Sequence, residues 1–206
     1  MISTKEIGGI TWHYRSHTND LGIIDQVFIH NACHIPEDLS GQLFIDIGAH
    51  IGGVSVLAAL RGAKVLAYEP MFNNYELLEM NAKENELDIE AFCVGIGEPG
   101  IRQLYTGGFN SGMNSAFLIF PELNEAIYEY MKVISLQEAI GDKVCDFVKI
   151  DCEGCEEEVL KQVLEIPEQV KQMQIDFHIQ NRNIIQDMAK LYDVKRLSND
   201  SYMFIR

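Results

Sequence analysis

Hydrophobic and polar positions follow two different periods along this chain from Leu43 onward. Short runs of apolar and β-branched residues predict buried strands over Leu43–Ile47 and Lys64–Glu69. Between them, Gly53–Leu60 has the length and composition of a helix. Because a strand, a helix and a second strand follow one another with short connections, this region predicts a βαβ unit of a mostly parallel sheet.

The same alternation continues to the end of the chain. Further helices are predicted over Asn73–Asn85, Leu136–Ile140, Glu156–Leu164 and Asn183–Leu191, and further strands over Glu90–Val94, Met131–Ile134, Cys145–Asp151, Gln172–His178, Val194–Leu197 and Tyr202–Ile205. No helix separates the last two strands, so the final strand is expected to run antiparallel. The pattern predicts a doubly wound α/β fold, with residues 1–206 as a single domain and residues 1–40 leading into its core.

Composition limits the partners that this chain could have. Lysine and arginine total 16 against 31 aspartates and glutamates, which gives a formal net charge of -15. A charge of this sign offers no attraction for a phosphate backbone, so a nucleic-acid partner is not expected. No apolar run reaches the length of a signal peptide or a membrane span, so we expect a cytoplasmic protein without membrane insertion.

The five cysteines are odd in number and lie mostly in apolar runs, so all are interpreted as reduced. Cys152 and Cys155 form one C-x-x-C pair. A structural zinc site usually needs a second such pair or added histidines at suitable spacing, and neither is present. A redox or metal role for this pair is therefore the minor interpretation.

A glycine-rich turn follows the first predicted strand, in the sequence Phe44–Gly53. Glycines on a strand-to-helix turn let a ligand approach the backbone and the free N–H groups of the helix start. Their spacing is G-x-x-x-G, whereas dinucleotide folds use G-x-G-x-x-G to hold a pyrophosphate, so a nucleoside without a pyrophosphate fits better. The candidate cofactor-binding residues of this turn are Asp46, Gly48, Ala49, His50 and Gly52.

An acidic residue ends the second predicted strand. Glu69, followed by Pro70, stands where a carboxylate can accept hydrogen bonds from both ribose hydroxyls, and both residues are candidate cofactor contacts. A literal G-x-G-x-x-G occurs at Gly95–Gly100, but Pro99 and the extended run after it do not fit a nucleotide-binding helix start. Gly97 within that stretch remains a candidate contact to a nucleoside.

Three linked motifs together resemble the FkbM-type methyltransferase family. They are Asp46–Gly52 (DIGAHIG), the pair Glu69–Pro70, and Lys149–Glu156 (KIDCEGCE); Thr18–Asp20 and a strand ending in His178 also resemble that family. His50 stands where the family usually has asparagine. The resemblance implies a Rossmann-like class I methyltransferase fold with a seven-stranded sheet, S-adenosylmethionine as cofactor, and O-methylation of a hydroxyl on a sugar, glycan, lipid or natural product.

Methyl transfer needs an aligned nucleophile and a group that takes its proton. His178 and Asp151 are the candidate catalytic residues, because both are predicted at the carboxyl ends of strands, where open α/β sheets bind ligands. Asp151 and Glu153 are also candidate cofactor contacts, and with Asp176 they could bind magnesium, although no metal is assigned. Glu157 and Glu158 are interpreted as acids that favour a helix start.

A glycine-rich hairpin and long loop are predicted between Gly95 and Gly112, continuing to Ser115. Ser115 is a candidate cofactor contact from this loop. Two alternatives stay open: a regulatory or inactive protein that keeps the cofactor pocket, and a nicotinamide-dependent oxidoreductase, which the glycine spacing disfavours. The acceptor is expected to be a small molecule or glycan of unspecified identity.

Overall fold

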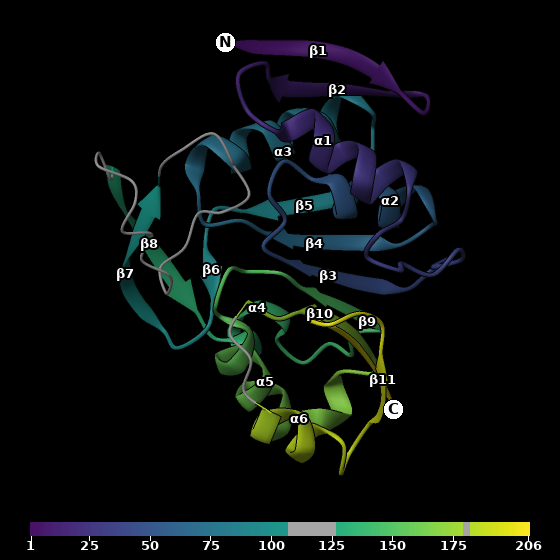
Figure 1. The fold of residues 1–206 in the computed structure, drawn as a ribbon, viewed down its shortest axis with the longest axis vertical. Helices are drawn as coiled ribbons and strands as arrows, with labels where there is room; N and C mark the ends of the chain where they lie inside the picture. The colour runs from purple at the N-terminus through teal and green to yellow at the C-terminus, as the bar shows by residue number, and fades with distance from the viewer. Residues whose placement is uncertain (107–126, 179–181) are drawn as a thin grey trace.

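A seven-stranded sheet forms the centre of the molecule, with strand order β11-β12-β10-β9-β3-β4-β5. The computed structural model describes residues 1–106, 127–178 and 182–206. Strands β10, β9, β3, β4 and β5 run parallel, and β12 is antiparallel to both β10 and β11. The predicted doubly wound α/β fold with an antiparallel last strand is confirmed (Figure 1).

The strands of this sheet are β3 (Leu43–Ile47), β4 (Lys64–Tyr68), β5 (Ile89–Phe92), β9 (Phe147–Ile150), β10 (Gln172–Asp176), β11 (Asp193–Arg196) and β12 (Ser201–Ile205). The helices are α1 (Asp20–Ile24), α2 (Gly53–Leu60), α3 (Phe72–Glu84), α4 (Leu136–Ile140), α5 (Glu156–Glu165) and α6 (Arg182–Met188), with a π-helical turn η1 (Asp25–Ile29) and a 3-10 turn η2 (Pro167–Gln169). None of the helices in the described part of the chain is long and apolar enough to cross a bilayer.

Helices cover both faces of the central sheet, with α1, α2 and α3 on one side and α4, α5 and α6 on the other (Figure 1). Successive residues of β3 explain why both faces are apolar. Phe44 packs in a cluster with α2, whereas Ile45 and Ile47 pack in a cluster with α5. Since β3 lies between β4 and β9, its side chains are buried on both faces, as the continuous apolar run predicted.

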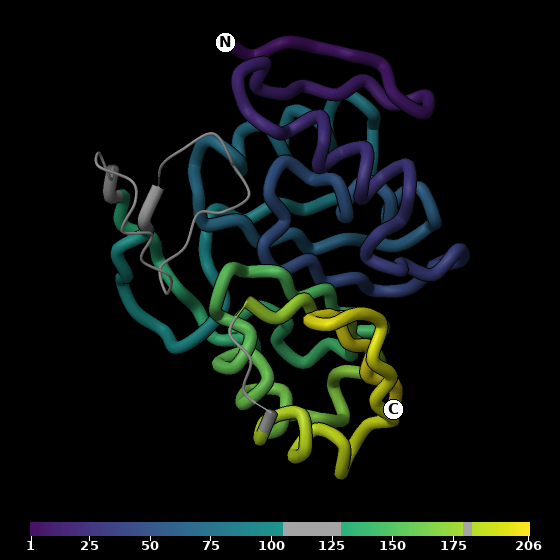
Figure 2. Tube along the Cα trace, in the orientation of Figure 1, coloured from purple at the N-terminus to yellow at the C-terminus, as the bar shows by residue number. Residues whose placement is uncertain are grey.

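The N-terminal region forms a hairpin that the sequence pattern did not predict. Strands β1 (Ile2–Ile7) and β2 (Ile10–Arg15) pair antiparallel, and β2 lies against α3. Trp12 is fully buried and makes an edge-to-face contact with Phe28, at a ring distance of 5.3 Å. Trp12 therefore belongs to the core. Figure 2 shows this hairpin in purple and the C-terminal hairpin in yellow on opposite sides of the molecule.

A second, three-stranded sheet follows β5, with order β6-β8-β7. Its strands are β6 (Gly95–Ile96), β7 (Gly100–Thr106) and β8 (Ile127–Ile134). The hairpin predicted between Gly95 and Gly112 differs from the observed pairing: β7 pairs antiparallel with β8, which begins only at Ile127, and β6 adds to β8 in parallel. Arg102 of β7 forms an ion pair with Glu158 of α5 at 2.8 Å, so Glu158 links this sheet to α5 in addition to its place in a helix start.

Several predicted strands are shorter than expected, among them the two that precede Glu69 and His178. Strand β4 ends at Tyr68, one residue before Glu69, and β10 ends at Asp176, two residues before His178. In the second case the backbone N–H of Phe177 donates to the carbonyl of Asp200, next to the last pair of the antiparallel β10–β12 ladder. Glu69 and His178 therefore lie in the connections that follow β4 and β10, at the carboxyl edge of the sheet.

Candidate functional site

The glycine turn joins the carboxyl ends of three strands. Gly48 has a φ of 85°, and its N–H donates to the Tyr68 carbonyl at 2.9 Å. A Cβ at Gly48 would lie 1.9 Å from the carbonyl oxygen of Asp151, which is too close for any side chain. The turn therefore needs glycine because the backbone after β3 and the backbone after β9 are in direct contact.

Two further residues shape the turn. Gly52 precedes α2 with a φ of 96°, and a Cβ there would lie 2.7 Å from Leu78 Cδ1. Asp46 is buried and accepts a hydrogen bond of 2.6 Å from the Ser55 hydroxyl in the first turn of α2. Burial raises the pKa of Asp46 to about 6, although the Ser55 hydrogen bond acts in the opposite direction. Asp46 thus links the end of β3 to the first turn of α2 through a hydrogen bond.

Glu69 lies directly beside this turn and is 6% exposed. Its Oε2 accepts the His50 backbone N–H at 2.8 Å, and its Oε1 accepts the N–H of Met71 at 2.9 Å and the Asn74 side-chain amide at 3.3 Å. Burial raises the pKa of Glu69 to about 7, and these three hydrogen bonds counteract the rise. A carboxylate has about four acceptor positions, so Oε2 keeps one for a further donor.

A cleft with about 630 Å³ of empty space opens over these groups. Of the predicted cofactor-binding residues, those that line the cleft are Gly48, His50, Glu69, Pro70, Asp151 and Glu153.

The remaining predicted residues are placed differently. Asp46, Ala49 and Gly52 support the turn but do not line the cleft. Gly97 is buried beside α5, where a Cβ would lie 2.6 Å from Glu158 Oε2, and it also does not line the cleft. Ser115 lies outside the described residues.

The second sheet supplies a wall of the cleft that sequence reasoning missed. This wall consists of Ile96, Arg102, Leu104, Met131 and Val133. The sequence predicted an extended segment at the position of β7 and a strand over Met131–Ile134, but it contained no local signal that the two pair or that they lie over the turn. The apolar side chains give the cleft a surface suited to a flat, weakly polar ring.

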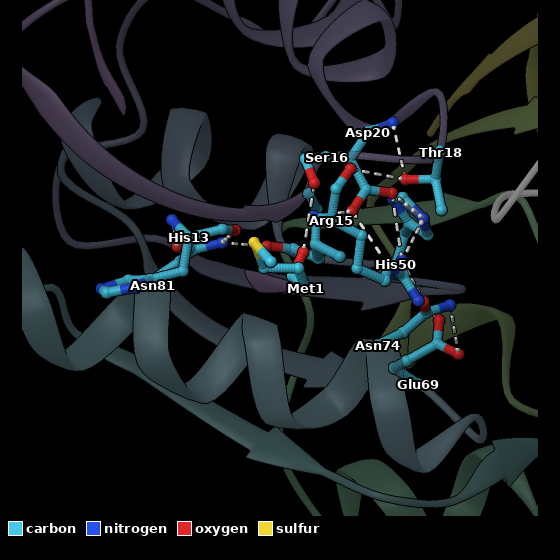
Figure 3. A network of polar contacts seen from close by, with 11 residues as sticks. Met1, His13, Arg15, Ser16, Thr18, Asp20, His50, Glu69, Asn74 and Asn81 are labelled. Carbon is cyan, nitrogen blue, oxygen red and sulfur yellow. Dashed lines mark hydrogen bonds and ion pairs between the residues drawn. The ribbon is translucent and has the colours of Figure 1, made fainter. Parts of the chain in front are cut away.

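A polar network connects the N-terminal region to the same cleft (Figure 3). Asp20 is fully buried and binds Arg15 through Nε at 3.0 Å and Nη2 at 3.1 Å. The Nη2 atom also donates to Asn74 Oδ1 at 2.7 Å, and Asn74 in turn donates to Glu69. The motif at Thr18–Asp20 therefore acts through Arg15 on two residues that line the cleft.

His50 occupies the centre of this network with a φ of 53°, which is uncommon for a residue other than glycine. Its Nε2 lies 3.6 Å from Asp20 Oδ1. Burial lowers the pKa of His50 to about 4, and Arg15 acts in the same direction while Asp20 opposes it. The His50 ring is therefore neutral at pH 7. Its backbone N–H, which donates to Glu69, is the part that contacts the predicted ribose site.

Acidic residues and one histidine gather after β9 and β10. His178 Nδ1 lies 2.9 Å from Glu156 Oε1, and its Nε2 lies 3.3 Å from Glu153 Oε1 and 3.7 Å from Asp151 Oδ1. Burial by itself would lower the pKa of His178, but the hydrogen bond to Glu156 and the charges of Asp151 and Glu153 outweigh it and raise the pKa to about 9. Burial raises the pKa of Glu153 to about 7.

Lys149 separates Asp176 from this group. Its ammonium is 1% exposed and lies 2.9 Å from Asp176 Oδ2 and 3.2 Å from Asp151 Oδ2. The predicted magnesium-binding set of Asp151, Glu153 and Asp176 is not brought together, because Asp176 pairs with Lys149. Within the described residues, the group whose atoms could hold one metal ion consists of Asp151, Glu153 and His178.

Cys152 and Cys155 are joined as a disulfide across the loop that carries Glu153. The interpretation that all five cysteines are reduced is wrong for this pair. Cys33, Cys93 and Cys145 are free thiols. Both cysteines of the disulfide line the cleft, so the bond constrains the acidic loop at the point where it meets the cavity.

Comparisons with known proteins agree with this geometry. A family model described as the methyltransferase FkbM domain matches residues 46–195. No curated protein matches the sequence significantly. Among solved structures, the chain is similar to magnesium protoporphyrin IX methyltransferase from Synechocystis PCC 6803 with bound SAM, with 12% identity, a TM-score of 0.53, and coverage of 91% of this chain and 80% of that one.

Two RNA methyltransferases show a similar fold. One is the T. thermophilus 16S rRNA methyltransferase in complex with AdoMet and guanosine, with 11% identity, a TM-score of 0.53, and coverage of 100% of this chain and 50% of that one. The other is a Pyrococcus abyssi tRNA uracil methyltransferase in complex with S-adenosyl-L-homocysteine, with 10% identity, a TM-score of 0.51, and coverage of 99% and 43%. The chain spans about half the length of these two proteins, and at such identities the likeness shows a shared class I fold. The match to the family model covers most of the sequence, and the chain belongs to the FkbM methyltransferase domain family.

Proposed function

We propose that this protein is an S-adenosylmethionine-dependent O-methyltransferase whose acceptor is a hydroxyl of a sugar, glycan, lipid or natural product. One observation carries the proposal. Glu69 is buried at the end of β4, faces the cleft, and keeps an acceptor position on Oε2 beside the glycine turn. A carboxylate in this place can accept a hydrogen bond from a ribose hydroxyl.

The cleft residues fit this cofactor. Glu69 would hold the ribose, and the apolar side chains of β6, β7 and β8 would cover the adenine ring. The carboxylates of Asp151 and Glu153, which also line the cleft, favour a positively charged group in their vicinity. When bound, S-adenosylmethionine supplies a methyl group activated by its positively charged sulfur.

The protein must then orient the acceptor hydroxyl and receive its proton. Asp151 lines the cleft, whereas His178 does not line it and contacts Asp151 and Glu153 from behind. We therefore assign proton acceptance to Asp151 and a positioning role to His178. The ion pair with Lys149 engages Oδ2 of Asp151, so Oδ1 is the oxygen left for this task.

The charge of the protein supports a small-molecule or glycan acceptor. The formal net charge is -15, and Glu69, Asp151 and Glu153 line the cleft itself. Bringing a phosphate backbone to this surface would cost electrostatic energy. A neutral polyhydroxylated acceptor avoids that cost.

Calorimetric titration with S-adenosylmethionine and S-adenosylhomocysteine tests the proposal. We expect dissociation constants in the micromolar range, weakened at least tenfold in Glu69→Gln and unchanged in Glu76→Ala, which alters an exposed acid on the neighbouring helix α3. Turnover is then measured as S-adenosylhomocysteine release with a panel of sugars and glycosides. Absence of binding by the folded protein would contradict the proposal, and binding without turnover on any hydroxyl acceptor would favour the regulatory alternative.

A further inference from the structure

Two carboxylates and one imidazole nitrogen converge at the carboxyl ends of β9 and β10. The ligand atoms that Asp151, Glu153 and His178 can offer all lie within 4.8 Å of one another. The three residues come from two different connections, so their approach results from the pairing of the strands and not from local sequence. Three donor atoms at this separation can contact a single ion placed between them.

The second ring nitrogen of His178 is held in the manner of a metal ligand. Its Nδ1 lies 2.9 Å from Oε1 of Glu156, whose side chain is 1% exposed. A buried carboxylate on one nitrogen fixes the ring orientation, so the other nitrogen is the one that can coordinate an ion once the ion displaces its proton. In this protein the presented nitrogen is Nε2, which faces Glu153 and Asp151.

Glu156 also has an acceptor oxygen that is not used in a hydrogen bond with the described residues. Its Oε1 additionally accepts the backbone N–H of Gly154 at 3.0 Å. Its Oε2 is buried and has no hydrogen-bond partner within the described residues. A buried carboxylate oxygen without a partner is costly. A cation held by the neighbouring side chains would reduce that cost.

Lys149 orients the remaining ligand. Its ammonium lies 3.2 Å from Oδ2 of Asp151, which leaves Oδ1 directed toward His178 at 3.7 Å. The same ammonium also forms an ion pair with Asp176. Lys149 therefore pairs with Asp176 and with one oxygen of Asp151, whereas the other oxygen of Asp151 and Oε1 of Glu153 lie near the histidine.

We propose that Asp151, Glu153 and His178 form a binding site for one divalent transition-metal ion such as Mn²⁺. An imidazole ligand beside two carboxylates favours Mn²⁺ or a later first-row ion over Mg²⁺, which prefers oxygen alone. Three protein ligands leave coordination positions open, and Asp151 and Glu153 line the cleft. The inference rests on the proposed function in one respect: with the ion bound, Asp151 would act as a ligand, and the ion would polarise the acceptor hydroxyl so that its proton passes to water, whereas Asp151 accepts the proton only in the metal-free protein.

Electron paramagnetic resonance with Mn²⁺ alone as probe tests this site. The signal of free Mn²⁺ decreases as the ion binds, so a titration gives stoichiometry and affinity without any turnover. We expect one ion per chain, with affinity reduced at least tenfold in Glu153→Gln and in His178→Gln. The variant Glu156→Gln should lose about tenfold, because the residue that orients a ligand typically contributes this much. Glu157→Gln is the matched control, since Glu157 lies in the same helical turn but pairs with Lys161 at 2.7 Å.

Titration of each variant with S-adenosylhomocysteine shows whether the cleft is still folded and separates the two proposals. Equal Mn²⁺ affinity in Glu153→Gln and Glu157→Gln, or no saturable binding to the unaltered protein, would overturn the metal site. If S-adenosylhomocysteine still binds in that case, the proposed function stands without the ion. If Mn²⁺ binds as expected but S-adenosylhomocysteine does not, the metal site stands and the proposed function fails.

Discussion

Replacement of Asp20 by asparagine should destabilise the protein and weaken its cofactor site together. The Asp20 side chain is 0% exposed and accepts both guanidinium hydrogen bonds of Arg15 as well as its backbone N–H. Removing one partner of a buried ion pair costs roughly 3–5 kcal/mol. Arg15 is 15% exposed and keeps its bond to Asn74, so we expect about 2–3 kcal/mol for Asp20→Asn.

The single tryptophan provides a local probe for this measurement. Trp12 is fully buried beside Phe28, within the N-terminal layer that Arg15 joins to the cleft. Urea unfolding is followed by Trp12 fluorescence and by circular dichroism, and coincident transitions allow a two-state free energy to be extracted. Asp25→Asn serves as the control, since the Asp25 side chain is 62% exposed, and it should change the free energy by no more than about 0.5 kcal/mol.

The second part of the prediction concerns ligand affinity. Arg15 contacts Asn74 and His50, and both of these residues donate to Glu69. We expect Asp20→Asn to weaken S-adenosylhomocysteine binding severalfold. An Asp20→Asn protein with the stability and affinity of Asp25→Asn would refute the reasoning that the buried pair supports the cleft.

Three other predictions concern the turn, its acid and the disulfide. Because burial raises the pKa of Glu69 to about 7, it is protonated below that pH, so calorimetric affinity for S-adenosylhomocysteine should fall from pH 8 to pH 6, and Glu69→Gln should remove this component. The unreduced, denatured protein should titrate three thiols and the reduced protein five, and five before reduction would contradict the Cys152–Cys155 bond. Gly48→Ala should lower the free energy of unfolding, measured in urea, by more than about 3 kcal/mol. Gly9 has a similar positive φ but lies in open space, so Gly9→Ala should lower it by only about 1 kcal/mol. Equal losses of stability in the two variants would show that backbone strain alone explains the effect.

The central sheet could be predicted because its signals are local. Strand β3 and helices α2 and α4 have the predicted bounds, since their apolar runs and flanking glycines or polar residues are contiguous in sequence. Glu69 was identified as a candidate for the same reason, because a carboxylate that directly follows a buried parallel strand lies at the carboxyl edge of the sheet.

The N-terminal layer and the second sheet could not be predicted in this way. Strand β2 is stabilised by side chains of α3, about 70 residues away in sequence. Strand β6 has only two residues and exists because it pairs with β8 across a long connection. Neither pairing leaves a periodic signal in its own segment, so the cleft wall formed by β6, β7 and β8 was missed.

The arrangement of the acidic residues after β9 and β10 could also not be predicted from the sequence. The sequence placed Asp151, Glu153 and Asp176 near the same edge, but it did not show which of them Lys149 would neutralise. The buried lysine selects Asp176 and one oxygen of Asp151, so His178 takes the place expected for Asp176. Choices of this kind depend on the direction of side chains at strand ends, which residue spacing does not encode.

Two asparagines, one in α3 and one at its C-terminal cap, affect how readily the N-terminal hairpin would aggregate in a crowded solution. Asn85 binds both the N–H and the carbonyl of Thr11, and Asn81 does the same for His13, so two side chains imitate the ladder of a neighbouring strand. An exposed strand edge offers its backbone groups to other chains and promotes aggregation. Along Thr11–His13 that edge is already occupied, and a helix thereby protects a small sheet from intermolecular pairing without adding a third strand.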